Sequence, residues 1–157
     1  EPKALYNSVD AASVVPDDFE VPFGKARIRR EGSDLSIITY GNTTHLCLKA
    51  ADRLAKENGW NVEVVDIRSL IPLDKETIFA SVQKTSKVLV VHEDKVFSGF
   101  GAELAATIGT EMFRYLDAPI QRVGSTFTPV GFNPILEHAI LPSEDKILKA
   151  AKELLEY

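Results

Sequence analysis

The sequence predicts an α/β domain in three layers, built on a five-stranded, mainly parallel sheet with one antiparallel strand at its edge. Beyond residue 25, short runs of aliphatic and β-branched residues alternate with longer segments whose apolar residues recur at helical spacing. Such alternation favours βαβ units with right-handed crossovers and parallel strands. The first run, residues 25–31, places Lys and Arg at alternate positions, which is typical of an edge strand with a charged outer face.

Composition places the chain among ordinary globular domains. Its 157 residues include 18 Lys and Arg against 23 Asp and Glu, which gives a formal charge of −5 and suits one domain. The basic residues are scattered, so the chain offers no electrostatic footprint for nucleic acid or for an anionic membrane. The longest apolar run, residues 88–91, is far too short to span a bilayer. We therefore expect neither a nucleic-acid nor a membrane partner.

The cysteine content and the first residues point to a reducing compartment. Cys47 is the only cysteine, so it cannot form an internal disulfide, and without Cys or His at ligand spacing it does not indicate a zinc site. The opening string EPKALYNSVD has neither an initiator Met nor the pattern of a signal peptide. We expect a processed or truncated chain in the cytoplasm, or in the mitochondrial matrix if the source is eukaryotic.

The N-terminal third is expected to hold a linker and a hairpin. Residues 1–24 are rich in Pro and acidic residues with little periodicity, which predicts an extended linker. Residues 25–31 and 35–40 are strand-like and flank Gly32-Ser33-Asp34, a turn that suits a β-hairpin. The second strand is the more apolar of the two, so we expect it to be the more buried.

Helices and strands then alternate to the C-terminus. Apolar stripes, together with Gly59 as a stop signal and Asp74 and Ser143 as caps, predict four helices. They cover residues 43–58, residues 74–85, residues 101–116 and a closing helix after Ser143. Three further strands are expected, over residues 62–67, 87–92 and 119–123.

Two glycine-containing turns are candidate ligand sites. In Gly41-Asn42-Thr43-Thr44 a strand turns into a helix, where free backbone N–H groups could hold an anion. The commoner explanation is that Thr43 or Thr44 merely caps the helix. Gly99-Phe100-Gly101 also precedes a helix, but a dinucleotide fingerprint needs a third glycine where Leu104 stands and a tighter strand-to-helix turn. We do not expect dinucleotide binding.

His92 is the third candidate, because it ends the most apolar strand, where open α/β sheets place functional groups. Its neighbour Glu93 should point to the opposite face, so the two do not predict an acid–base dyad. A hydrogen-bonded histidine at an interface is the more usual explanation. His45 and His138 have no partners at ligand spacing, so we expect no metal site, and the chain has no nucleophile elbow and no Walker loop.

Six strings in order along the chain resemble a known family. They are EPKALYN, VPFGKARIRREGSDLSIITYG, VEVVDIRSLIPLDKETI, VVHEDKVFSGFGAEL, YLDAPIQRV and TPVGFNPILEHAILPSEDKI. Together they resemble the C-terminal part of the β chain of the thiamine-dependent 2-oxoacid dehydrogenase component, a domain of the transketolase C-terminal type. The pyruvate and branched-chain (2-oxoisovalerate) enzymes share these strings, and we favour the branched-chain one. Ser98 and Gly131 depart from the family pattern, which usually has Gly and Pro there.

The resemblance implies a non-catalytic domain. In this family thiamine diphosphate and Mg²⁺ are held by a GDG…N motif on the partner α chain or region, and the activating Glu lies in the N-terminal domain of the β chain. This sequence contains no GDG, and EPKALYN resembles the last residues before the linker. The expectation is a linker over residues 1–24 from a missing pyrimidine-binding domain and a C-terminal α/β domain over residues 25–157. No catalytic, cofactor-binding or metal-binding residue is assigned.

The implied role is assembly within an enzyme that decarboxylates a 2-oxoacid and acylates a lipoyl group. Expected partners are the α chain or region, a second β copy and the lipoyl acyltransferase core. Four phenylalanines in Gly-rich or Pro-rich loops fit an interaction surface, unless they simply pack over the sheet. They are Phe97, Phe100, Phe127 and Phe132. We also expect His92 and residues 97–101 to belong to a subunit contact or a partner surface and to take no part in the chemistry. The alternative is a stand-alone α/β module that holds an anionic ligand at the Thr43 and Gly101 helix starts.

Overall fold

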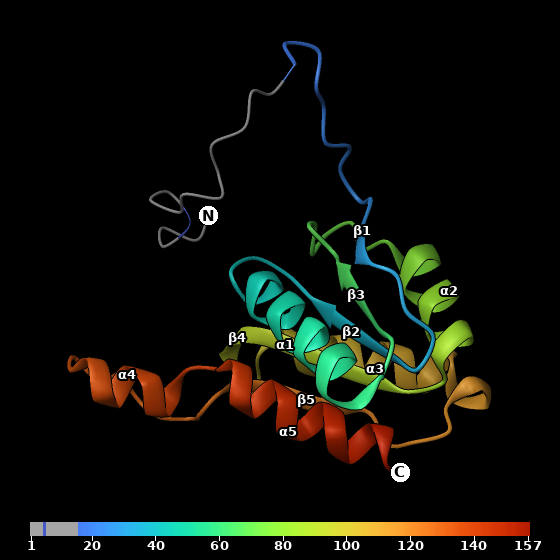
Figure 1. Cartoon of the computed structure of the whole chain (residues 1–157). Coiled ribbons are helices and arrows are strands. Elements are labelled where there is room, and N and C mark those ends of the chain that lie inside the picture. The colour runs from blue at the N-terminus through green and yellow to red at the C-terminus, as the bar shows by residue number, and fades with distance from the viewer. Residues whose placement is uncertain (1–4, 6–15) are drawn as a thin grey trace.

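The computed structural model describes residue 5 and residues 16–157 (Figure 1). Most of the expected linker, residues 1–4 and 6–15, lies outside the described residues. Residues 16–24 contain neither helix nor strand and are almost all exposed, which is compatible with an extended segment. The boundary between linker and domain at residue 25 stays a prediction.

A five-stranded sheet forms the centre of the fold, in the order β1-β3-β2-β4-β5. Its strands are β1 (Arg27–Arg30), β2 (Leu35–Thr39), β3 (Val62–Asp66), β4 (Val88–Lys95) and β5 (Gln121–Ser125). The pairs β2–β3, β2–β4 and β4–β5 are parallel, and β1 is antiparallel to β3. The predicted sheet, mainly parallel with one antiparallel edge strand, is therefore confirmed.

The predicted hairpin between the first two strands is wrong, because β3 lies between β1 and β2. Strand β1 pairs with β3, with Ile28 opposite Val65. The connecting turn crosses the start of β3 instead of folding back on itself: the backbone N–H groups of Ser33 and Asp34 both donate to the carbonyl of Asn61, at 2.8 and 3.0 Å. Local alternation of side chains marks both strands, but it carries no information about which strand each one joins.

Five α-helices and a short 3₁₀ helix connect the described strands, where four helices were predicted. They are α1 (Thr43–Asn58), α2 (Lys75–Thr85), α3 (Phe100–Glu111), η3 (Phe113–Tyr115), α4 (Pro134–Ile140) and α5 (Glu144–Leu155). The predicted caps are confirmed: Asp74 accepts from the Thr77 N–H at 3.2 Å, and Ser143 accepts from the Lys146 N–H at 3.3 Å. The unexpected helix, α4, buries no residue and so leaves no apolar stripe in the sequence.

Helices cover both faces of the sheet, which confirms the three layers (Figure 1). Helices α1 and α5 pack on one face, where they meet Ile37, Val64 and Leu89. Helices α2 and α3 cover the other face, where the next residue along each of these strands points. Those residues are Ile38, Val65 and Val90, and every one of these six side chains is fully buried. The carboxyl ends of β2, β3, β4 and β5 share one edge of the sheet, because these strands are parallel.

Candidate functional site

Strand β4 is irregular where it reaches the carboxyl edge of the sheet. Its register with β5 shifts between Val91 and Lys95, as in a β-bulge. Ser125 holds this bulge: its hydroxyl donates to the carbonyl of Glu93, and its own carbonyl accepts from the Val96 N–H at 3.0 Å. The bulge leaves Glu93 exposed while the residue before it, His92, turns into the protein, as the strand pattern predicts.

The imidazole of His92 is fully buried and enclosed by three glycines. A Cβ at Gly99 would lie 2.9 Å from Cε1 of His92, and a Cβ at Gly124 would lie 3.2 Å from Nε2. A Cβ at Gly101 would collide outright with Nε2. Because real Cβ atoms essentially never come within 3.0 Å of another heavy atom, only glycine fits at Gly99 and Gly101 while the ring stays in place.

Aromatic rings complete the enclosure of His92. The ring of Tyr40 stacks on the imidazole, with centroids 6.4 Å apart and planes 14° apart, and Phe100 meets Tyr40 edge-on at 6.2 Å. Neither ring nitrogen of His92 has a hydrogen-bond partner among the described residues, so the expected hydrogen bond is not formed there. Burial lowers the pKa of His92, with Arg122 adding to the effect and Asp94 opposing it.

A neutral, sealed imidazole is suited to packing and not to proton transfer with a substrate. A general base must come within hydrogen-bond reach of the proton it removes, and nothing can approach the His92 nitrogens without opening the start of α3. Because the ring is fully buried, it cannot touch a partner directly. Its role at a subunit contact stays a prediction, and any such effect would be transmitted by the loop that packs on the ring. What the structure shows is that the His92 ring packs directly against Gly99 and Gly101, at the start of α3.

At the start of α1, several of the groups that could bind an anion are already hydrogen-bonded within the chain. Thr43 and Thr44 are the first two helical residues, and Asn42 occupies the cap position without a side-chain cap bond. Both threonine side chains are buried: the Thr43 hydroxyl donates to the Tyr40 carbonyl at 2.8 Å, while that of Thr44 has no partner among the described residues. The Thr44 and His45 N–H groups already donate to backbone carbonyls. The anion role of this turn stays an untested prediction.

The four phenylalanines separate into two groups. Phe100 begins α3, packs against the core and is only half-exposed. Phe97 and Phe127 are each 66% exposed and contact each other edge-to-face, with centroids 4.8 Å apart. Phe132, just before α4, is completely exposed. Sequence reasoning missed their exposed neighbours Val130, Ile135 and Leu136, which lack the helical stripe or strand alternation that marks an element.

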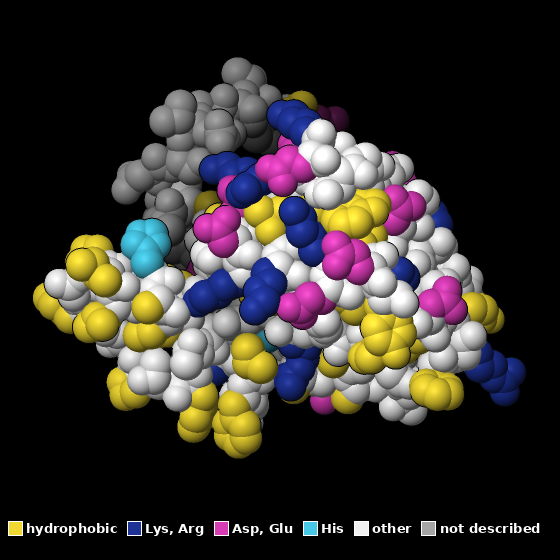
Figure 2. All heavy atoms as spheres, turned by 60° about the horizontal axis from the view of Figure 1, so that its bottom comes forward, with side chains coloured by type: hydrophobic (Ala, Val, Ile, Leu, Met, Phe, Trp, Pro, Cys, Tyr) yellow, Lys and Arg dark blue, Asp and Glu magenta, His cyan; other side chains and the backbone are white. Residues whose placement is uncertain are grey.

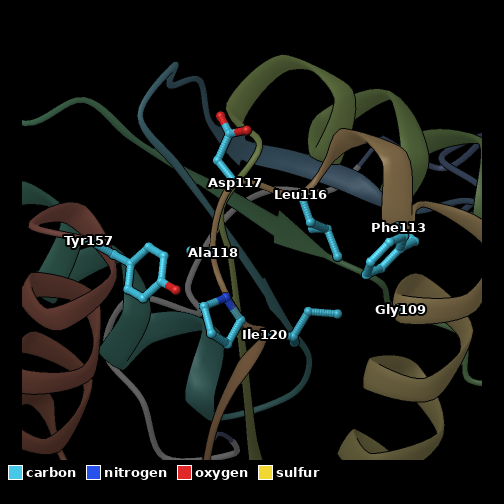
Figure 3. Close-up of a pocket in the computed structure, with 8 residues that line it drawn as sticks. Gly109, Phe113, Leu116, Asp117, Ala118, Ile120 and Tyr157 are labelled. Atoms are coloured by element: carbon cyan, nitrogen blue, oxygen red, sulfur yellow. The ribbon is translucent and has the colours of Figure 1, made fainter.

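A hollow of about 430 Å³ lies at the opposite, amino end of the strands (Figure 3). Phe113, Leu116 and Ile120 line it from one side, and Tyr157 faces them from the C-terminus. Asp117 supplies the one ionisable carboxyl group of its side-chain lining, and its backbone N–H is held by the Ser86 carbonyl at 2.8 Å. A mainly apolar hollow without converging polar groups does not define a substrate site.

Chemically reactive groups do not cluster in the described part of the chain. No three His, Cys, Asp or Glu side chains among residue 5 and residues 16–157 are placed to hold a metal ion. The thiol of Cys47 is buried in the core, which raises its pKa to about 12. In the same residues, no helix has both the length and the apolar character that crossing a bilayer requires.

Fold and site together define an α/β domain with a mainly parallel sheet. His92 is buried near the carboxyl edge of that sheet, and exposed apolar side chains lie beside it. Residues 24–147 match the family described as transketolase, C-terminal domain, and the chain belongs to that family. The expected resemblance is thereby confirmed.

Similar proteins include β subunits of several oxidoreductases. The chain is 40% identical over 156 residues to acetoin:2,6-dichlorophenolindophenol oxidoreductase subunit beta of Bacillus subtilis, covering 99% of this chain and 44% of that protein. It is 40% identical over 158 residues to 2-oxoisovalerate dehydrogenase subunit beta of the same species, covering 100% and 48%. It is 42% identical over 144 residues to pyruvate dehydrogenase E1 component subunit beta of Rickettsia felis, covering 91% and 44%.

A solved structure agrees with these relatives. A split-gene transketolase, described as an inactive beta4 tetramer, superimposes with a TM-score of 0.76 at 27% identity, covering 92% of this chain and 46% of that one. The chain thus spans less than half the length of the relatives it matches.

Proposed function

We propose that this chain is the non-catalytic C-terminal domain of the β component of a thiamine-diphosphate-dependent 2-oxoacid dehydrogenase. The observation that carries the proposal is the 40–42% identity over nearly the whole chain to the β subunits of a 2-oxoisovalerate and a pyruvate dehydrogenase. The complete enzyme would decarboxylate a 2-oxoacid and transfer the acyl group to a lipoyl arm. Both relatives match to a similar degree, and we favour the branched-chain substrate.

We place the thiamine diphosphate and Mg²⁺ sites outside this chain, because the sequence lacks the GDG motif that the family resemblance assigns to them. In the described part of the chain, no three His, Cys, Asp or Glu side chains lie close enough together to hold a metal ion, which supports this assignment. We therefore assign both groups to other parts of the complete enzyme, where thiamine diphosphate supplies the electron sink for decarboxylation. No step of the reaction is assigned to a residue of this chain.

The role proposed for the domain is assembly. Its partners would be the α chain or region and a second β copy, with the lipoyl acyltransferase core docking on the assembled enzyme. The exposed phenylalanines beside the sealed carboxyl edge support this role, since large apolar side chains on exposed loops usually mark contact sites. The similar transketolase chain that forms a beta4 tetramer supports association between copies. The complete enzyme would work in the cytoplasm, or in the mitochondrial matrix of a eukaryote.

Calorimetry on the isolated chain tests the non-catalytic part of the proposal. Thiamine diphosphate titrated into the chain with Mg²⁺ is expected to give no binding heat, and no 2-oxoacid is expected to be decarboxylated. Binding in the micromolar range would contradict the proposal, because it would place the cofactor on a domain that we assign to assembly alone.

A chimera tests the family role directly. The matched C-terminal region of the Bacillus subtilis 2-oxoisovalerate dehydrogenase subunit beta would be replaced by this chain and co-expressed with its α subunit. We expect thiamine-dependent decarboxylation to be retained, while a control β subunit truncated before this region should not assemble. A chimera that folds but fails to bind the α subunit would contradict the proposed assembly role.

A further inference from the structure

The chain enters the α/β domain at a fixed point. The Gly24 N–H donates to the Ser69 hydroxyl at 3.1 Å, and the Ala26 N–H donates to the Asp74 carboxylate at 2.8 Å. Before this point, residues 16–23 are all exposed, and in Figure 1 they run away from the layered body. They form a short segment that is anchored to the domain at its C-terminal end.

Arg68 strengthens the anchor. Its guanidinium donates to the carbonyls of Lys25 and Ala26, at 2.9 and 3.2 Å. The backbone of Arg68 has a φ of 53°, which costs free energy in a residue other than glycine, so the surrounding contacts must hold it there. Together with the bonds to Ser69 and Asp74, these contacts make residues 24–26 a fixed base.

Gly24 is the first residue of this base and has the freedom of a hinge. Its φ is 68°, a value that favours glycine, and a Cβ there would lie only 2.8 Å from Cγ of Pro72. Because glycine changes its backbone angles more readily than any other residue, the segment before it can swing about this point. The segment therefore starts directly beside Pro72 and its neighbours.

The segment itself is amphipathic. Its apolar side chains lie at alternate positions, and all three are exposed: Phe19 by 56%, Val21 by 49% and Phe23 by 90%. Asp18 and Glu20 stand between them. In an extended chain, alternate side chains share one side, so the apolar groups face one way and the carboxylates the other. Such a pattern is typical of a segment with one buried side, yet this side has no cover in the structure.

An apolar hollow of about 410 Å³ lies next to the fixed base. Its lining includes Leu70, Ile71 and Leu73 from the connection between β3 and α2, and Phe100 and Thr107 from α3. Ile71 is 89% exposed. Pro72, which lies beside Gly24, stands between two of the lining residues, so the hollow and the hinge are adjacent.

We propose that residues 17–23 form a strap that closes over this hollow, with Gly24 as its hinge and its three apolar side chains as the groups that enter. The strap and the hollow belong to the same chain. Closure therefore needs no partner and does not depend on the proposed function.

The strap has a suitable length and shape. Five extended residues span about 17 Å at most, so all three apolar side chains can reach a hollow whose lining begins at the neighbours of Pro72. Pro22 restricts Val21 to extended backbone, which lowers the entropy lost on closure. A short tether also holds the strap at a roughly millimolar effective concentration, so a modest apolar contact is enough.

Charge favours contact through the apolar side of the strap. Asp17, Asp18 and Glu20 form no ion pair with the other described residues. On the face of the molecule in Figure 2, positive and negative side chains are interspersed and form no patch of one sign. The hollow itself is lined by Lys75 and Glu103, one group of each sign. The carboxylates of a closed strap would thus stay in water.

Thiol labelling of the full 157-residue chain tests the strap. In Val21→Cys the new thiol lies on the apolar side, while the native Cys47 thiol is buried with its pKa raised to about 12 and should not react. We expect Ile71→Asp to make maleimide labelling of the new thiol faster by about 10-fold, as for a strap that is closed about ten times as often as it is open. Ile71 is so exposed that its replacement removes little packing within the domain.

A second variant and a control locate the effect. Phe23→Asp opens the strap from the other side of the contact and should speed the labelling of Val21→Cys to a similar extent. The matched control is Val130→Cys, which changes a valine that is 66% exposed and lies outside the strap. Adding Ile71→Asp should leave its labelling rate unchanged. In the wild type, nuclear Overhauser contacts are expected between the ring of Phe23 and the methyl groups of Ile71.

Two results would overturn the strap. Labelling of Val21→Cys that neither Ile71→Asp nor Phe23→Asp accelerates would show that the segment does not close over the hollow. Protection that grows with protein concentration would show that a second copy covers the segment instead. Neither result affects the chimera experiment, so the strap can fail while the proposed function stands.

Discussion

Helix α3 begins directly on the ring of His92: Nε2 of the histidine lies where a Cβ of Gly101 would have to be. The distance between the start of α3 and β4 therefore leaves room for the imidazole ring but not for an additional Cβ at Gly101. The loop before the helix carries the exposed Phe97 and ends at Gly99, which also lies against the ring.

We expect Gly101→Ala to destabilise the domain by about 1–3 kcal/mol, as overpacking does in a close-packed interior. The measurement is urea unfolding followed by circular dichroism. Gly109→Ala is the matched control in the same helix, because its Cβ would meet only Ile120 Cδ1 at 3.7 Å. It should stabilise the domain by about 0.5–1 kcal/mol, since Ala is the better helix former.

The double variant His92→Ala/Gly101→Ala tests the cause of that loss. If the ring is what the new methyl group strikes, adding the alanine should cost less in the His92→Ala background than in the wild type, with a coupling energy of about 1 kcal/mol or more. Additive losses would show that the two residues do not compete for the same space.

Acid should weaken the domain through His92. Burial lowers the pKa of this ring in the folded state, so the unfolded chain binds the proton more readily. The stability that the neutral ring contributes is fully present above the unfolded pKa of about 6.5 and is lost as the pH falls below it toward the lowered folded value. Asp94 and Arg122 act on the ring in opposite senses. The free energy of unfolding should therefore decline between about pH 7 and pH 5.

The comparison of wild type with His92→Asn isolates this contribution from other titrating groups. The slope of unfolding free energy against pH should be smaller in the variant, by at most about 1.4 kcal/mol per pH unit. Identical slopes in wild type and His92→Asn would mean that the ring takes up its proton without disturbing the fold.

Lys84 neutralises a carboxylate that is fully buried in β3. Glu63 is completely inaccessible, and its Oε2 accepts from Lys84 and from the Gly32 N–H at 3.2 Å. Lys84→Met leaves that charge without its cation, and we expect a loss of about 2–4 kcal/mol. In the double variant with Glu63→Gln most of this loss should be recovered. Thermal and urea unfolding measure both.

The control is Lys75→Met, because the ion pair of Lys75 with Glu111 is exposed on both sides. Exposed pairs contribute about 0–1 kcal/mol, so this change should be small. Equal losses of unfolding free energy in Lys75→Met and Lys84→Met would show that burial of Glu63 does not make its ion pair more stabilising than an exposed one.

The Cys47 thiol should report global unfolding. Burial raises its pKa to about 12, so almost no thiolate forms near neutral pH, and the thiolate is the reactive species. We expect Ellman's reagent to react with Cys47 in native buffer only at the rate at which the whole domain opens. Rapid reaction in the native state, measured at 412 nm as the released thiolate, would show a local opening of the α1 packing.

Most of the helices and strands could be predicted from the sequence, because local patterns of apolar residues and caps determine them. The stripe between Thr43 and Asn58 predicted α1 with its observed bounds, and Asp74 and Ser143 cap helices as expected. The pairing of β1 could not be found in this way: the contact of Ser33 and Asp34 with Asn61 joins positions that no local pattern connects. Helix α4 was missed for the opposite reason, since an element without a buried face has no periodicity.

The sequence predicted a strand that ends at His92, whereas β4 continues through a bulge to Lys95. The surroundings of His92 could not be predicted from the sequence. Gly99 and Gly101 were visible as part of a turn, whereas Gly124 lies in another strand and meets the ring only in the folded chain. Tyr40, the residue after β2, likewise meets the ring only in the folded chain. The residue types therefore suggested a site at His92. The long-range contacts, which only the structure shows, bury the ring among glycines and an aromatic side chain.

The pairing of β1 with β3 has a mechanical consequence. Strand β1 is held at the edge of the sheet by one antiparallel neighbour, and its register cannot form until β3 is in place. Pulling on the N-terminal side of Gly24 would first load the hydrogen bonds of the Gly24 N–H to Ser69 and of the Ala26 N–H to Asp74. The ladder between β1 and β3 would be loaded next, before the four parallel strands. We therefore expect the N-terminal edge of the sheet to unfold under force before the parallel part of the sheet does.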